Sequence, residues 1–234
     1  MYQIGKFLSH WLNAVDAHSL QSPFIYDLFR DVLKEQANGQ EFDQLIELRK
    51  HHLNSKKMIS FSELGALSKG PDSQSIGHIT RHGSTKPKLS RLLYRLAMSN
   101  QSRTIIDLGT STGLNTAYLA LVEDSQVYTF EGNQALSHHA RENFDQLGLT
   151  NVHQVAGNID QTLSSTLLTI DSVDFAFFDA NHRYEPTLDY FKKVLQKSNE
   201  NTIMVFDDIH WSKEMDDDWA EIIAQPEITL SIDL

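Results

Sequence analysis

The spacing of hydrophobic residues changes near residue 101, and this change divides the chain into two parts. Before residue 101, apolar residues recur about every three or four positions, which is typical of amphipathic helices. Four helices are predicted there: residues 4–15, residues 22–33 with Ser22-Pro23 as their start, residues 41–53, and residues 89–96. Residues 55–87 are rich in Gly, Ser, Lys and Pro, and we expect a long surface loop.

After residue 101, short apolar runs alternate with segments of helical length. The five runs are TIIDLG, VYTFEG, VHQVAG, VDFAFFDA and TIMVFDD, which begin at residues 104, 127, 152, 173 and 202. Such runs indicate parallel strands that helices cover on both sides. The predicted fold class is therefore α/β, a doubly wound and mainly parallel sheet over residues 101–234 with an N-terminal helical extension over residues 1–100. A sixth run, ITLSIDL, occupies residues 228–234.

Composition excludes several kinds of protein. The chain has no cysteine, which excludes disulfides, thiolate zinc sites and cysteine nucleophiles. A net charge of -11 argues against binding to nucleic acid. No apolar run approaches the roughly 20 residues that span a bilayer, and the N-terminus lacks the pattern of a signal peptide. We therefore expect a cytoplasmic protein with neither nucleic acid nor a membrane as its partner.

The ends of the predicted strands carry the candidate chemistry. All runs but the third end in a carboxylate, and the strand ends are residues 107–113, 131–132, 157–158, 179–182 and 207–210. In open α/β sheets, ligands bind outside the carboxyl ends of the strands. Acidic side chains gathered at one edge repel one another, so this edge is predicted to be a functional site.

The turn after the first run allows three hypotheses. Its sequence GTSTG fits a nucleophile elbow, and Ser111, Asp179 and His210 follow the order of a hydrolase triad. A dinucleotide site needs G-x-G-x-x-G, and Ser111 would crowd a pyrophosphate there. A nucleoside cofactor without phosphates needs only a glycine turn, here Gly109 and Gly113, and an acid for the ribose hydroxyls, here Glu131.

The motifs IIDLGTSTGLNT, VYTFEGN, VAGNID, VDFAFFDANHRYEP and IMVFDDIHW follow one another along residues 104–208. Together they resemble class I S-adenosylmethionine-dependent methyltransferases, and within that superfamily they are similar to O-methyltransferases of the catechol and caffeoyl-CoA type. The family turn usually reads E-x-G-x-x-x-G, and Asp107 stands here in place of the glutamate. The resemblance implies O-methylation of a small-molecule acceptor by a bacterial enzyme.

The resemblance also implies roles for individual residues. S-adenosylmethionine would be bound by residues of all the strand ends but the last: Asp107, Gly109, Thr110, Ser111, Gly113, Asn115, Glu131, Gly132, Asn158, Ile159 and Asp179. Asp179, Asp207 and Asp208 match positions that hold a divalent metal such as Mg²⁺ in the family, although the last two read Asp-Asp rather than Asp-Asn. Whether a metal is present stays open; without one, the pKa of at least one of these carboxyls should rise.

His182 lies close to the place of the family's catalytic lysine, and with Asp179 it is the candidate catalytic pair. An imidazole there could act as general base, and His210 is the competing candidate. His78 and His82 form an HxxxH pair, but Gly83 and Pro87 argue against the helix that would align them as ligands.

Two further expectations come from the resemblance. The family sheet has seven strands, and because the sixth run reaches residue 234, we predict that the seventh strand is absent. The N-terminal helices would select the acceptor, pack on the sheet or form a homodimer face. Beside the methyltransferase hypothesis stand a serine hydrolase built on Ser111 and a non-catalytic protein that retains the cofactor fold.

Overall fold

The computed structural model describes residues 22–34, 39–61 and 73–234, together with five isolated positions before residue 22. Most of the predicted helix over residues 4–15 lies outside the described residues, as does part of the predicted loop, residues 62–72. No described helix has the length and apolar character needed to cross a membrane.

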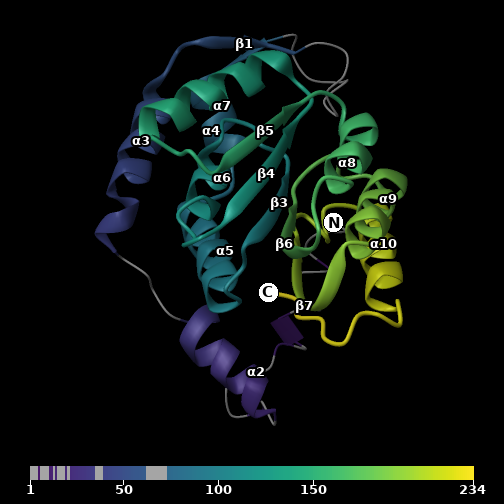
Figure 1. Cartoon of the computed structure of the whole chain (residues 1–234). Coiled ribbons are helices and arrows are strands. Elements are labelled where there is room, and N and C mark those ends of the chain that lie inside the picture. The colour runs from purple at the N-terminus through teal and green to yellow at the C-terminus, as the bar shows by residue number, and fades with distance from the viewer. Residues whose placement is uncertain are drawn as a thin grey trace.

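A five-stranded parallel sheet forms the centre of the molecule (Figure 1). Its strands are β3 (Thr104–Leu108), β4 (Gln126–Glu131), β5 (Val152–Ala156), β6 (Val173–Phe178) and β7 (Ser198–Phe206). The order β5-β4-β3-β6-β7 places the reversal of strand order between β3 and β6. The predicted α/β fold class is therefore confirmed, and all five predicted runs are strands of this sheet.

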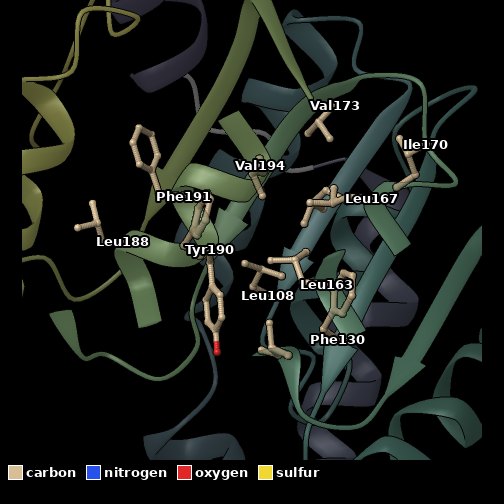
Figure 2. Close-up of a cluster of buried hydrophobic side chains, with 14 of the residues drawn as sticks. Leu108, Phe130, Leu163, Leu167, Ile170, Val173, Leu188, Tyr190, Phe191 and Val194 are labelled. Atoms are coloured by element: carbon tan, nitrogen blue, oxygen red, sulfur yellow. The ribbon is translucent and has the colours of Figure 1, made fainter. Parts of the chain in front are cut away.

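Helices cover both faces of the sheet (Figure 1). On one face lie α5 (Pro87–Ser99), α6 (Leu114–Leu119) and α7 (Gln134–Leu147), and on the other α8 (Ile159–Leu167), α9 (Tyr184–Leu195) and α10 (Lys213–Ile223). Alternate strand residues point to opposite faces, so Ile105 packs in the first layer while Ile106 and Leu108 pack in the second. Figure 2 shows the second layer, where Leu163 and Phe191 lie against the strands.

Shorter elements precede α5. They are α2 (Pro23–Leu28), which continues as the π-turn η2 (Phe29–Leu33), then η3 (Gln40–Phe42), α3 (Asp43–Asn54), the antiparallel pair β1 (Met58–Ser60) and β2 (Ser73–Ser75), and α4 (Ile76–His82). The prediction of a loop throughout residues 55–87 was therefore wrong. Gly83 directly follows α4 and Pro87 opens α5, so these two residues bound helices rather than prevent them.

Two expectations about strands need correction. The run ITLSIDL forms neither strand nor helix, because no neighbouring strand pairs with residues 228–234. The chain has seven described strands, against the expectation of a missing seventh, but β1 and β2 form a sheet of their own, and the described main sheet holds five.

Candidate functional site

The glycine turn after β3 needs both of its glycines. Gly109 has a φ of +117°, and a Cβ there would lie 2.3 Å from the backbone oxygen of Asp179. Gly113 has a φ of +80°, and a Cβ there would lie 2.8 Å from the Phe144 ring. The turn therefore passes close to the end of β6, at the point where the strand order reverses, which is where ligands bind in such sheets.

Glu131, at the tip of β4, is joined to the glycine turn by hydrogen bonds. Its two carboxylate oxygens accept from the backbone N–H groups of Ser111 and Asn133, each at 2.8 Å. Burial raises its pKa. The Gly132 backbone is a further partner. Because a carboxylate has about four acceptor positions, the group keeps capacity for a hydroxyl donor.

Asp107 lies beneath the turn and is fully buried. One of its oxygens accepts from the hydroxyls of Thr116 and Thr129, at 2.6 and 2.8 Å. Burial raises the pKa of Asp107 to about 6. The structure thus connects this predicted cofactor residue to α6 and β4, and the two threonines are functional candidates that the sequence did not reveal. Both threonines belong to elements that flank a buried acid, and that position is the feature of the sequence that could have identified them.

The predicted catalytic and metal-binding residues come together at the ends of β6 and β7. His182 Nε2 lies 3.6 Å from Asp179 Oδ1, and its Nδ1 lies 3.9 Å from Asp208 Oδ2. Burial and the neighbouring Asp207 raise the pKa of Asp179 well above its usual range. Burial and Asp208 likewise raise the pKa of Asp207, the direction expected for acidic side chains gathered at one edge.

These residues do not fit a metal site. The His182 imidazole stands between two of the three proposed carboxylate ligands, Asp179 and Asp208. Across residues 22–34, 39–61 and 73–234, no group of three histidine or acidic side chains is spaced to hold a metal ion. We therefore assign no chemical step to a divalent cation at these acids.

The loop that carries His182 has an uncommon backbone conformation. Asn181 and His182 have φ values of +68° and +40°, in the left-handed region. The amide of Asn181 donates to the Tyr190 hydroxyl at 2.7 Å, and that hydroxyl donates to Asp160 at 2.5 Å. Figure 2 shows the Tyr190 oxygen at the margin of the apolar cluster. Tyr190 thus joins the loop to α8, a role that sequence analysis missed because its apolar neighbours predict only core packing.

The hydrolase triad is not assembled. Ser111 has a φ of +49°, as a nucleophile elbow would require, but its N–H is bound to Glu131. The ring nitrogens of His210 contact Asp216 at 2.7 Å and Asp233 at 2.8 Å. No hydrogen bond within the described part of the chain joins the Ser111 hydroxyl to a histidine. His210 is therefore paired with acidic side chains away from the glycine turn. This pairing argues against His210 both as the triad histidine and as the competing base.

Asn158, Ile159 and the histidine pair of residues 78 and 82 have structural surroundings of their own. Asn158 caps α8 by accepting from the N–H of Asp160 at 3.0 Å, and Ile159 is buried in the core beside it. His78 and His82 lie on α4 with ring centroids 4.6 Å apart, so the expectation that no helix aligns them was wrong. With no third ligand among the described residues, they do not form a metal site.

Comparison with known proteins agrees with this geometry. Residues 106–209, somewhat under half of the chain, match a family described as "Methyltransferase domain". A catechol O-methyltransferase of Niastella koreensis is 28% identical over 147 residues, which are 61% of this chain and 66% of that protein. A protein-L-isoaspartate O-methyltransferase of Pyrococcus abyssi is 25% identical over 72 residues, 31% of this chain and 33% of that protein.

Solved structures support the fold. An O-methyltransferase of Bacillus cereus in complex with S-adenosylhomocysteine has a TM-score of 0.57 at 17% identity, over 87% of this chain and 86% of that one. A Streptomyces achromogenes O-methyltransferase of tomaymycin synthesis in complex with S-adenosylmethionine has a TM-score of 0.56 at 16% identity, over 91% and 88%. The resemblance predicted from the sequence is supported at the level of the family: residues 106–209 match the methyltransferase domain.

Proposed function

We propose that this chain, whose residues 106–209 match the methyltransferase domain, transfers the methyl group of S-adenosylmethionine to a hydroxyl of a small-molecule acceptor. The observation that carries the proposal is the junction of Glu131 with the glycine turn. The carboxylate accepts from the Ser111 N–H and keeps acceptor capacity for a ribose hydroxyl beyond its backbone partners. A pyrophosphate would meet this carboxylate and the Ser111 side chain, which favours a cofactor without phosphates.

His182 is the proposed general base. When bound, the cofactor supplies a methyl group activated by a positively charged sulfur. The acceptor oxygen would bond to this methyl carbon as the sulfur–carbon bond breaks, with the electron pair of that bond staying on the sulfur. His182 takes the hydroxyl proton on its imidazole. Asp179 and Asp208 flank the ring on its two nitrogen sides and would hold it in position.

The first experiment is calorimetric titration with S-adenosylhomocysteine, with NAD in parallel. We expect binding of S-adenosylhomocysteine alone, weakened about tenfold or more in Glu131→Gln, because the ribose loses its charged acceptor. Glu123→Gln, an exposed position, is the matched control and should bind like the wild type. Equal binding of NAD, or no effect of Glu131→Gln in a folded protein, would contradict the proposal.

Metal dependence is measured on the same protein. We expect chelation with EDTA to leave both S-adenosylhomocysteine binding and methyl transfer to a panel of small phenols and alcohols unchanged. Added Mg²⁺ should then have no effect. Methyl transfer that falls on chelation and returns with Mg²⁺ would show that the acids at the ends of β6 and β7 rearrange into ligands.

The left-handed φ of Ser111 keeps a serine hydrolase as the second candidate. Ser111→Ala separates the two functions. In a methyltransferase, this variant keeps the backbone N–H that binds Glu131, so cofactor binding should change only a few-fold. In a hydrolase, the same change would abolish cleavage of activated esters.

A further inference from the structure

The connection between α4 and α5, residues 83–86, contacts the candidate site at two places. The Ser84 hydroxyl lies 3.4 Å from the Thr112 hydroxyl, in the glycine turn. The Thr85 hydroxyl donates to Asp179 Oδ2, also at 3.4 Å. Both contacts are long for O–H···O hydrogen bonds, so the side chains alone hold this connection weakly. Its position must be fixed elsewhere.

Arg49 of α3 contacts this region through two hydrogen bonds. One guanidinium nitrogen donates to the backbone oxygen of Thr85 at 3.1 Å, and another donates to the backbone oxygen of Thr80 at 3.3 Å. Thr80 is in the last turn of α4, where carbonyls lack partners within the helix and a positive charge is favourable. The planar guanidinium therefore bridges the end of α4 and the connection that follows Gly83, a geometry that a lysine cannot reproduce.

We infer that Arg49 is a positioning residue of the methyl-transfer site. It holds residues 83–86 over the carboxyl ends of the strands, so that Ser84 supports the glycine turn and Thr85 orients Asp179. The inference rests on the proposed function, because it assigns this surface to the cofactor. It extends the site to α3, outside the matched methyltransferase domain.

Apolar contacts other than those of Arg49 anchor α3. Helix α3 is anchored by Leu45 and Leu48, which are buried, and Leu45 packs against Tyr118 of α6. Arg49 is only partly buried, and its hydrogen bonds recorded in the structure go to the two backbone oxygens. Its loss should therefore loosen residues 83–86 while α3 stays in place.

The test compares Arg49→Gln and Arg49→Lys with Lys50→Gln. Lys50 is the next residue of α3, and its side chain is 63% exposed, so this control removes the same charge from the same helix without touching the connection. We expect both Arg49 variants to bind S-adenosylhomocysteine about tenfold more weakly than wild type, since two charge-assisted hydrogen bonds are lost or misdirected. Lys50→Gln should bind like wild type.

Thr85 tests whether Arg49 acts through residues 83–86. Thr85→Val removes the hydroxyl but leaves the backbone oxygen that Arg49 binds, so α3 and α4 are undisturbed. It should lower the rate of methyl transfer, and Thr85→Ser should restore it. In the double variant Arg49→Gln/Thr85→Val, the losses should be less than additive, because coupled residues share one effect.

The outcomes separate the two proposals. If a folded wild-type protein binds no S-adenosylhomocysteine, the proposed function fails and this inference with it. If the wild type binds and Arg49→Gln binds equally well, the inference alone is overturned. Fully additive losses in the double variant, or a Thr85→Val variant that transfers methyl groups at the wild-type rate, would also overturn it. If Arg49→Gln does not fold, the comparison of Thr85→Val with Thr85→Ser still tests the inference.

Discussion

His182 holds the most informative position at the scale of single residues, because it lies between Asp179 and Asp208. If it is the general base, His182→Gln should reduce methyl transfer by roughly 100-fold, since a positioned base contributes about that much. Binding of S-adenosylhomocysteine should stay within a few-fold of wild type. The matched control is His138→Gln, whose side chain is 77% exposed on α7. Parallel losses of turnover and binding in His182→Gln would indicate a structural role instead.

Asp218 of α10 is a buried carboxyl with no hydrogen-bond partner among the described residues. Burial, helped by Glu221 and Glu214, raises its pKa to about 7. The folded state thus binds a proton that the unfolded state releases between about pH 4 and 7, so the free energy of unfolding should fall as pH rises through that range.

Asp218→Asn removes this penalty. We expect the variant to gain stability over wild type as pH rises, reaching about 1 to 3 kcal/mol above pH 7, in denaturant titrations at a series of pH values. Asp217→Asn, at the exposed neighbouring position, should show no such pH-dependent gain. A constant difference between Asp218→Asn and wild type from pH 4 to 8 would refute the explanation.

The residues of the site differ in how far sequence could reveal them. Strand ends of a parallel sheet meet at one edge, so placing Asp179 and Asp208 together needed only the hydrophobic pattern. Tyr190 and Arg49 contact the site from helix positions whose orientation depends on packing. Nothing local distinguishes Tyr190 from its apolar neighbours or Arg49 from Lys50, and only the fold shows which side chain faces the site.

At the scale of elements, the glycine turn decides whether β3, β4 and β6 can share one ligand. Gly109→Ala would place a Cβ 2.3 Å from the backbone oxygen of Asp179, and backbone atoms cannot rotate away. We expect S-adenosylhomocysteine binding to be lost in calorimetry. Gly148→Ala is the control: its φ is also positive, at +68°, but no atom lies within 4 Å of the added Cβ.

Gly148→Ala should therefore cost only conformational strain, about 1 kcal/mol, and keep cofactor binding. If both alanine variants bind S-adenosylhomocysteine like wild type, the close approach of the turn to Asp179 is not needed for the cofactor. If both variants lose the same amount of stability and both lose S-adenosylhomocysteine binding, backbone strain alone explains the effect.

The elements themselves were predictable where a local pattern is sufficient. Strands that are buried on both faces appear in the sequence as apolar runs. Helix α5 is indicated by its repeated leucines. The run ITLSIDL has the same local pattern, but a strand also needs a neighbour to pair with, and residues 228–234 have none in the described sheet. Helix α4 was missed for the opposite reason, because Gly83 and Pro87 lie just beyond it and resemble breakers.

At the scale of the whole molecule, the N-terminal segment is coupled to the site through α7. His52 Nε2 of α3 lies 3.4 Å from Asn143 Oδ1, and the amide of Asn143 donates to the backbone oxygen of Thr112 at 2.9 Å. The buried His52 ring also lies 4.9 Å from the His139 ring. The prediction of a boundary at residue 100 stays untested, but α3 and the glycine turn share these contacts.

Because His52 and His139 are buried together, the free energy of unfolding should depend on pH. Burial, with the neighbouring His139, lowers the pKa of His52 to about 4, and burial also lowers that of His139. The folded state keeps both rings neutral while the unfolded state takes up protons below about pH 6.5. The stabilisation is therefore complete above pH 6.5 and is lost as pH falls toward 4, by about 1 to 3 kcal/mol for His52.

His52→Gln tests this coupling, because glutamine can still donate to Asn143 but does not titrate. Urea unfolding between pH 7.5 and 4.5 should show a shallower acid loss in the variant than in wild type, with the remaining slope due partly to His139. His51→Gln, at the exposed neighbouring position, should follow the wild-type curve. Because α3 carries Arg49, S-adenosylhomocysteine affinity should weaken over the same pH range in wild type and less in His52→Gln. If the free energy of unfolding falls equally with pH in the two proteins, other groups cause the loss of stability in acid. The proposed coupling of α3 to the glycine turn would then be contradicted.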